Sequence, residues 1–378
     1  MKKIGIVLSL LLFGWSVQAQ EITTGAIENL APQGSYTPSF DVDGAEKAPL
    51  NVILMIGDGM GMAHVASAMF ANGGELTITN LKTCGWVRTQ SATHFTTDSA
   101  ASGTAYATGQ KTHNSAIGMD VDDNPIANLP EKLAKKGIVS GIVTTDDLDG
   151  ATPSAFFAHQ PKRYNSAEIW ADMASSKLSF FSAGSAEAFA EQIYETQDAI
   201  LKKFEVVNDI DDARKAKADR LGYLPPKAKT ASVNSNRGDF LPATTAFAIE
   251  FLASKAAEGK GFFLMVEGAR IDKSSHNNDF PAMVRETLDF DKAVEAAVRF
   301  AEKDGNTLVI ISADHETGAL TLGNGKPDEG KMEGVFSSGH HTAIPVPLFA
   351  YGPSSHEFMG MQENSDVSLK IARLLTGE

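Results

Sequence analysis

The chain has 378 residues, of which 43% are hydrophobic, 21% are charged and only 1 is Cys. These values are ordinary for a globular protein, and they exclude a disordered chain, a collagen-like repeat and a disulfide scaffold. The formal net charge of −14 argues against a nucleic-acid partner, because binding to phosphate backbones requires clustered positive charge. A chain of this length can bury a large core as one α/β domain or as two smaller domains.

The first 20 residues, MKKIGIVLSLLLFGWSVQAQ, carry two lysines, then an apolar run at 4–15, then small residues at 17 and 19. This order is typical of a secretory signal peptide, which we assign to residues 1–19 with cleavage before Gln20. A retained membrane anchor is the alternative, but the run is shorter than the roughly 20 apolar residues that span a bilayer. No later run is long enough to span. We therefore expect a periplasmic protein, with release outside the cell as the lesser alternative.

Regular structure is expected from residue 50 onward, after a polar N-terminal arm at 20–49 that Pro and Gly interrupt. Beyond the arm, short apolar runs alternate with longer helical patterns. In the pattern at 281–303, Phe290, Val294 and Val298 fall on one face, as in a helix that packs on a sheet. The apolar runs predict five buried strands, at 51–57, 137–145, 261–268, 306–312 and 346–352.

These five runs are almost continuously apolar, as a sheet covered by helices on both faces requires. The alternation of strand and helix patterns therefore predicts an α/β fold, a three-layer α/β/α sandwich around a central, mostly parallel sheet. Residues 50–378 are interpreted as a single domain. Two charged or irregular segments, at 204–240 and 322–340, are interpreted as insertions or surface loops.

Acidic and imidazole side chains recur where the predicted strands end, which is where covered parallel sheets collect their reactive groups. Oxygen and imidazole donors without cysteine suit zinc in a catalytic site, with magnesium where all the donors are oxygen. The groups concerned are Asp58, residues 146–152, residues 267–276, Asp314 and His315, and finally His340 and His341, just before the fifth strand.

Each of these motifs also has a simpler interpretation. Asp272 and His276 are four residues apart, which places both on one side of a helical turn, but the segment also fits a solvated acidic loop. Asp314 and His315 directly follow a strand, where a bare charge is costly unless it is paired or metal-bound. Asp58 lies between two glycines, which also fits an ordinary strand-to-helix turn. The metal-site interpretation rests on their common position at strand ends.

Ser99 is a candidate nucleophile because it lies near the start of a small-residue helical pattern, TTDSAASGTAYATG at 96–109. The amino end of a helix offers free N–H groups and positive potential to an anion, so a serine there is well placed to attack phosphorus. The simpler interpretation is a helix cap, since Asp98 and Ser99 are both good capping residues.

Six segments, taken together, resemble the alkaline phosphatase family of metal-dependent phosphomonoesterases. The resemblance spans roughly residues 50–353, and its motifs occur in the family's order. The segments are IGDGMG (56–61), TTDSAASGTAYATG (96–109), ATPSAFFAHQPKR (151–163), VEGARIDKSSH (266–276), SADHETG (312–318) and HHTAIPVPLFAYGP (340–353).

The resemblance implies three metal sites, two for zinc and one for magnesium. It matches Asp272, His276 and His341 to the ligands of one zinc. It matches Asp58, Asp314 and His315 to those of the second zinc. Thr152 and Glu267 match the remaining protein ligands of a magnesium site onto which Asp58 bridges. His340 is the alternative to His341, which is favoured because the family places its ligand directly before a threonine, here Thr342.

The resemblance also implies the roles of three residues that contact phosphate. Ser99 matches the nucleophile that forms a phosphoserine intermediate. Arg163 matches the arginine that clamps phosphate oxygens in a fork, and Lys273 matches a position that supports phosphate through water. The expected substrates are small phosphate monoesters, which are hydrolysed to an alcohol and inorganic phosphate. His159 matches a family position near this site.

The sequence departs from the family at the magnesium site. Family members usually carry Asp or His two residues before the magnesium-site threonine, and this chain has Gly150 there. We therefore expect weaker magnesium binding than in relatives with Asp at that position, unless Asp149 turns in. The chain is also short for the family, which reduces the expected dimer surface, although a homodimer is still expected.

Two alternatives to a phosphomonoesterase remain at this stage. A phosphodiesterase or sulfatase on the related fold usually differs at the nucleophile, and Arg163 with the third-site ligands favours a monoester dianion. A non-catalytic periplasmic binder of phosphate or metal would need neither Ser99 nor two adjacent metal sites.

Overall fold

The computed structural model describes residues 22–28, 31–184, 186–326 and 331–378. Its main element is a ten-stranded sheet, with helices on both faces. The sheet order is β15 (Gly360–Glu363), β3 (Thr83–Arg88), β14 (Val346–Tyr351), β9 (Thr307–Ser312), β2 (Asn51–Gly57), β8 (Phe262–Gly268), β4 (Val139–Thr144), β5 (Phe180–Ser182), β7 (Leu221–Tyr223) and β6 (Glu205–Val207). The segment assigned to a signal peptide, residues 1–19, lies outside the described residues.

The sheet is mostly parallel, as the sequence predicts. Only β14 runs against its neighbours, and it pairs antiparallel with both β3 and β9. The central strands β2, β8 and β9 are buried along their whole length. Such burial needs helices on both faces, which explains the continuous apolar runs. The prediction of a three-layer α/β/α sandwich is therefore confirmed.

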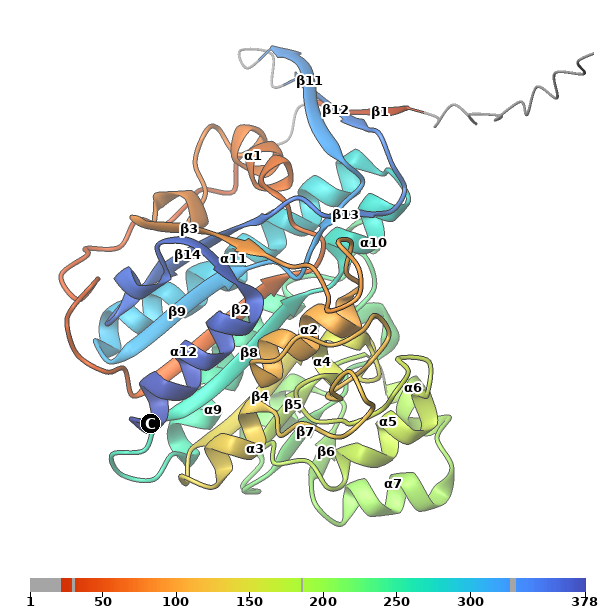
Figure 1. Ribbon diagram of the computed structural model, residues 1–378, viewed down its shortest axis with the longest axis vertical. Coiled ribbons are helices and arrows are strands. Elements are labelled where there is room, and N and C mark those ends of the chain that lie inside the picture. The colour runs from red at the N-terminus through yellow and green to blue at the C-terminus, as the bar shows by residue number, and fades with distance from the viewer. Residues whose placement is uncertain (1–21, 29–30, 185, 327–330) are drawn as a thin grey trace, which may run out of the picture.

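The helices form the two outer layers. Figure 1 shows α2 and α12 in front of the sheet, and α9 and α11 behind it. The helices are α1 (Met62–Ala71), α2 (Ser99–Thr108), α3 (Leu129–Ala134), α4 (Ala151–Ser154), α5 (Ser166–Met173), α6 (Ala186–Ala190), α7 (Tyr194–Leu201), α8 (Ile210–Lys215), α9 (Phe240–Lys255), α10 (Arg270–His276), α11 (Phe280–Asp304) and α12 (Asn364–Thr376).

Helix α11 forms where the amphipathic pattern predicts it. The Asp279 side chain caps its first turn by accepting from the Ala282 N–H at 3.0 Å, and Gly305 ends it in the left-handed conformation. Phe290, Val294 and Val298 are fully buried on its inner face. This helix therefore covers the central strands that carry most of the site.

The segment 204–240 is not the surface loop that its composition suggests. It contains β6, α8 and β7, and β7 and β6 are the last strands at one edge of the sheet. These strands have only three residues each, and charged residues flank them. Segments so short are too brief to give a periodic hydrophobic signal, which explains why the sequence did not reveal them.

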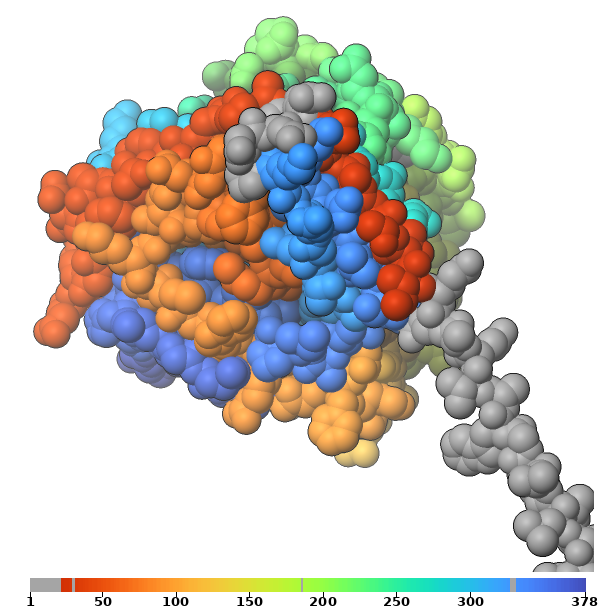
Figure 2. Space-filling model, turned by 90° about the horizontal axis from the view of Figure 1, so that it is seen from above, coloured from red at the N-terminus to blue at the C-terminus, as the bar shows by residue number. Residues whose placement is uncertain are grey.

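The second irregular segment, 322–340, also contains regular structure. Strands β11 (Leu320–Lys326) and β12 (Lys331–Phe336) pair with β1 (Thr23–Ile27) in a separate three-stranded sheet. Figure 1 shows this sheet standing out from one end of the molecule, and Figure 2 shows β1 beside the two strands on that face. The N-terminal arm thus contributes a strand. Farther along, Gln33 donates to the Leu288 carbonyl at 2.8 Å.

A buried ion-pair cluster fixes the end of the segment 204–240 to α11. The Arg237 guanidinium, 1% exposed, bonds Glu286 at 2.8 Å and Asp289 at 2.5 Å, and it donates to the Ala231 carbonyl at 3.0 Å. Burial raises the pKa of Asp289 to about 6, and the Arg237 charge opposes this shift while the Glu286 charge adds to it. The cluster needs all of its members, because a lone buried charge has no water to solvate it.

Replacement of Arg237 with Ala is expected to lower the free energy of unfolding by about 3–5 kcal/mol, since it leaves two carboxylates without their partner. Urea denaturation followed by circular dichroism measures this loss. The control is Arg285→Ala, which removes one hydrogen bond from α11 to Asn234 and should cost less than about 1 kcal/mol. Equal effects of the two changes would contradict a special role for the buried cluster.

Candidate active site

The site lies where four neighbouring strands end. Strands β9, β2, β8 and β4 are adjacent in the sheet and parallel to one another. Asp58 follows β2, Glu267 belongs to the end of β8, and Asp314 follows β9 by two residues. Thr152 lies on α4, just beyond the loop that leaves β4. The strand ends therefore bring together groups that are up to 256 positions apart in the sequence.

One cluster contains Asp58, Asp314 and His315, all buried. The His315 Nε2 atom lies 3.4 Å from Asp58 Oδ1 and 3.2 Å from Asp314 Oδ2. The other oxygen of Asp314, Oδ1, accepts from the Gly59 and His315 backbone N–H groups, both at 3.0 Å. These two bonds orient Oδ2 toward the cluster.

A second cluster contains Asp272 and His276 from α10 and His341 from β13 (His341–Thr342). The His276 Nε2 atom lies 3.3 Å from Asp272 Oδ2 and 3.1 Å from His341 Nε2, and His341 Nε2 lies 3.6 Å from Asp272 Oδ1. The neighbouring His340 belongs to neither cluster. Short strand β13 pairs with β10 (Glu316–Thr317), which brings His341 in from a distant part of the chain.

The spacing of the donor atoms fits a metal ion in each cluster. Ligands about 2.0–2.1 Å from a tetrahedral zinc are roughly 3.3 Å from one another, and the distances above range from 3.1 to 3.6 Å. Two imidazole Nε2 atoms that face each other, as those of His276 and His341 do, both have a lone pair available to a cation when neither carries a proton. The donor sets contain oxygen and imidazole and no sulfur, which suits zinc.

Each of the three histidines is held by its other ring nitrogen. The Nδ1 atoms lie 2.8 Å from the Gly339 carbonyl for His276 and 3.0 Å from the Thr97 carbonyl for His341. The Nδ1 atom of His315 lies 3.2 Å from the Thr317 hydroxyl. Partners of this kind fix the ring orientation of histidine ligands.

Thr317 is a site residue that the sequence did not single out. Its hydroxyl donates to Asp272 Oδ1 at 2.5 Å and also lies beside His315, so it links the two clusters. Its position two residues after His315 was the only available signal. A threonine near a ligand motif is too common to identify without the structure.

Three oxygens on segments that end or follow the central strands share one feature. Thr152 Oγ1, Glu267 Oε1 and Asp58 Oδ1 are buried, and none has a hydrogen-bond partner within the described part of the chain. Buried polar atoms without partners are rare in folded proteins. An all-oxygen set of this kind suits magnesium.

The negative charge of the site lacks compensation from the protein alone. Burial, together with the Asp314, Asp272 and Glu267 charges, raises the pKa of Asp58 well above its usual range. Burial, and next the charge of Asp146, also raises the pKa of Glu267. Bound cations would offset these charges and return both carboxyls to the ionised form.

Ser99 is the first residue of α2 and 4% exposed. The Asp98 side chain caps the helix by accepting from the Ala101 N–H at 3.0 Å. The interpretation as a helix cap is met by Asp98, and the role of Ser99 as nucleophile stays a prediction. The Ser99 Oγ atom lies 3.1 Å from the His315 Nε2 atom, at the edge of the first cluster.

Arg163 and Lys273, the two cationic residues expected to contact phosphate, each pair with a carboxylate. Arg163 Nη1 lies 3.3 Å from Asp98 Oδ2, so the capping residue of α2 also holds the guanidinium at the amino end of this helix. Lys273 Nζ pairs with Asp146, in the loop after β4. The Asp149 carboxylate does not take the place of the side chain missing at position 150, because it accepts from the Ser166 hydroxyl.

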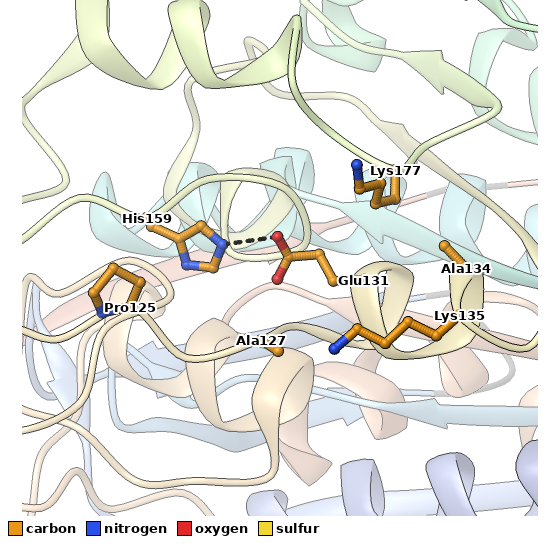
Figure 3. A pocket seen from close by; sticks show the side chains of 7 residues that line it. All are labelled: Pro125, Ala127, Glu131, Ala134, Lys135, His159 and Lys177. Carbon is orange, nitrogen blue, oxygen red and sulfur yellow. Dashed lines mark hydrogen bonds and ion pairs between the residues drawn. The ribbon is translucent and has the colours of Figure 1, made fainter.

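His159, which the resemblance matches to a family position near the site, belongs to neither metal-type cluster. Its Nδ1 atom contacts the Gly118 carbonyl at 2.8 Å, and its Nε2 atom pairs with Glu131 at 3.2 Å. Figure 3 shows His159 and Glu131 facing each other in a surface pocket that Lys135 and Lys177 also line. The histidine therefore joins α3 to the segment that follows α4.

The His159 pair predicts a pH-dependent contribution to stability. The hydrogen bond to Glu131 outweighs burial and raises the pKa of His159 above 6.5. Stabilisation from this histidine is full below pH 6.5 and is lost as the pH rises through the raised pKa. The pKa of Glu131 is lowered despite burial, by His159 and the Asn128 N–H, so the pair also weakens as the pH falls below 4.5.

Replacement of His159 with Gln should therefore cost roughly 1 kcal/mol near pH 6 and distinctly less at pH 9. Unfolding free energies at several pH values provide the measurement. The control is His94→Gln at an exposed position, where the cost should not follow the same profile. A His159→Gln cost that stays constant from pH 6 to pH 9 would exclude an ionic contribution.

Comparison with known proteins identifies the family. The alkaline phosphatase family model matches residues 50–200 and 227–335. Alkaline phosphatase 4 of Bacillus subtilis is 30% identical over 424 residues, with 86% of this chain and 88% of that protein covered. Alkaline phosphatase of Escherichia coli is 29% identical, with 97% and 98% covered. Streptomycin-6-phosphate phosphatase of Streptomyces griseus is 31% identical, with 84% and 88% covered.

Solved structures agree with the sequence relatives. The alkaline phosphatase from the Antarctic bacterium TAB5 is 37% identical, with a TM-score of 0.82, and the match covers 88% of this chain and 100% of that one. A variant of that enzyme with magnesium bound in its M3 site has a TM-score of 0.80 at 36% identity, with 87% and 99% covered.

The fold and the site define a hydrolase of the α/β class with clustered metal-type ligands. The chain belongs to the alkaline phosphatase family and is a phosphoric monoester hydrolase. The resemblance noted from the sequence is thereby confirmed. Within the described residues, none of the helices combines the length and the apolar character needed to cross a bilayer.

Proposed function

We propose that this protein hydrolyses phosphate monoesters in two steps, through a phosphoserine on Ser99, with two zinc ions and one magnesium ion. The observation that carries the proposal is the position of the Ser99 Oγ atom, 3.1 Å from a histidine of one donor cluster and at the amino end of α2. A serine at that place meets a phosphate dianion with helix N–H groups and cations around it.

Two groups of donor atoms support the proposed zinc ligands. Asp272, His276 and His341 would hold one zinc, and Asp58, Asp314 and His315 the second. Asp58, Thr152 and Glu267 would hold the magnesium, with their unpartnered oxygens as donors. When bound, two adjacent metal ions stabilise the entering and leaving oxygens of an in-line displacement. The TAB5 variant with magnesium in its M3 site supports metal use in this family.

The chain's own groups would bind and orient the substrate. Arg163 has a planar guanidinium that can donate two parallel hydrogen bonds to phosphate oxygens. Its bond to Asp98 fixes it at the amino end of α2. The Ser99 oxygen then attacks phosphorus, the bond to the alcohol breaks, and water later hydrolyses the phosphoserine and restores the serine. Lys273 would support the phosphate through water.

We further propose the cellular setting that the sequence suggests. The N-terminal segment would direct export to a periplasm, where residues 50–378 would act as one catalytic domain on small phosphate monoesters. A homodimer remains the expected assembly, and size-exclusion chromatography with light scattering would detect it.

The Ser99 role is tested with p-nitrophenyl phosphate and its bis-ester, at alkaline pH, on chelator-stripped enzyme restored with zinc and magnesium. Ser99→Ala should lower monoester turnover on the order of 10³-fold or more, because it removes the attacking oxygen. Zinc content should stay unchanged. Preference for the bis-ester would instead indicate a diesterase. A zinc-loaded protein without either activity would favour a non-catalytic binder.

Asp98 should act through Arg163. Asp98→Ala is expected to raise KM for the monoester roughly 10-fold, and the helix should lose about 1 kcal/mol with its cap. Arg163→Ala should raise KM in the same direction. Because the two residues work as a pair, the double variant should be impaired by less than the product of the single effects. Multiplicative effects in this cycle would show that Asp98 does not act through the arginine.

A further inference from the structure

Position 150 has no side chain, yet the space beside it is filled. A Cβ atom built on Gly150 would lie 2.6 Å from Asp146 Oδ2 and 2.9 Å from Asp146 Cγ. The backbone at Gly150 has φ −53° and ψ 146°, which other residues also adopt. The Asp147 carbonyl oxygen would also lie 2.9 Å from that Cβ, so space and not backbone conformation favours glycine here, and the Asp146 carboxylate fills most of that space.

The neighbouring groups show what that carboxylate faces. Asp146 follows the end of β4, where its N–H donates to Thr144 Oγ1 at 2.8 Å. The same Thr144 hydroxyl donates to Glu267 Oε2. One threonine therefore ties the loop of Asp146 to the carboxyl that ends β8, and the other oxygen of that carboxyl, Oε1, is buried without a partner in the described structure.

The two oxygens of Asp146 have different surroundings. Oδ1 receives the Asp147 N–H at 2.9 Å and pairs with Lys273 Nζ. Oδ2 lies at the place where a side chain from residue 150 would begin, two residues before Thr152. Thr152 Oγ1 is itself buried without a hydrogen-bond partner among the described residues. The side of Asp146 that does not hold the lysine thus faces Gly150, two residues before Thr152 in the chain.

The other acidic residues of this loop point elsewhere. Asp149 accepts from the Ser166 hydroxyl. The Asp147 side chain lies against Gly184, where an added Cβ would meet its Oδ1 at 2.7 Å. Of the three aspartates in the loop, Asp146 alone is directed into the space beside Gly150.

We propose that Asp146 supplies the carboxylate that position 150 lacks at the magnesium site, with Oδ2 facing the ion or its bound water and Oδ1 holding Lys273. This inference rests on the proposed function, since it deepens one of its three metal sites. Mg²⁺ keeps several waters in proteins and is bound by one or two carboxylates, so a carboxylate at the edge of its shell adds charge without a rigid cage. Magnesium binding would therefore not be weak, as Gly150 alone suggests.

The test is magnesium affinity itself, measured by equilibrium dialysis and metal analysis on protein that retains two zinc ions per chain. Asp146→Asn keeps the shape and removes the charge, so it should weaken magnesium binding about 10–100-fold, as loss of a supporting carboxylate does at other metal sites. The matched control is Asp149→Asn, three residues along the same loop, which should leave the affinity within twofold.

A transfer of the carboxylate tests position as well as charge. Asp146→Ala should lose affinity as Asp146→Asn does. Asp146→Ala with Gly150→Asp should regain part of it, because removal of the first carboxylate leaves only the Asp147 carbonyl oxygen, at 2.9 Å, against the new Cβ. The regain needs no assumption about how well Asp146→Asn folds.

Magnesium affinity of Asp146→Asn equal to that of the wild type would overturn the proposal and leave Asp146 as the counter-ion of Lys273 alone. So would a double variant that binds no better than Asp146→Ala. These results are independent of the reaction, because the same titration on Ser99→Ala should give wild-type affinity. Failure of the Ser99 assay with a positive Asp146 result would therefore contradict the proposed function and not this inference.

Discussion

The structure depends on a concentration of buried carboxylates at the ends of three adjacent strands. Asp58, Asp314 and Glu267 are at most 7% exposed, and burial with mutual repulsion raises the pKa of Asp58 and of Glu267. Removing such charges from water costs several kcal/mol each unless they are compensated. The protein has few cations of its own there. The site is therefore built to be completed by bound ions, and this explains how an acidic protein can act on anionic substrates.

The fold makes this concentration possible. In a parallel sheet with helices on both faces, the carboxyl ends of all central strands meet at one edge. Strands β9, β2 and β8 are rigid and fully buried, so the groups that follow them are held by the core. Helix α2 contributes Ser99, the proposed nucleophile, from one of the covering layers. Its capping residue Asp98 joins the helix to Arg163, so the helix cap and the proposed phosphate ligand belong to one network.

A shell of hydroxyl and carbonyl groups sets the directions of the donors. Thr317 joins Asp272 to His315, and backbone carbonyls hold His276 and His341. The loop after β4 adds the part that differs from the family pattern. There Gly150 has no side chain, and the Asp146 carboxylate lies in the space beside it. The side chain that is missing at position 150 is thus replaced by the carboxylate of Asp146, four residues earlier, because side chains from the two positions would share the same space.

The sequence by itself determined the five central strands of the ten-stranded sheet, the α/β layering and the donor types at the strand ends, because burial in a covered sheet and metal chemistry both restrict the residues allowed. Its patterns did not reveal β6 and β7, because a strand of three residues is too short to show a hydrophobic period. The tertiary structure placed His341, which the sequence favoured over His340, in a donor cluster. Only the tertiary structure brought Thr317 beside Asp272 and His315, and Asp146 beside Gly150. The reason is physical: composition and period report whether a residue is buried, whereas the direction of its side chain depends on neighbours that are distant in the chain.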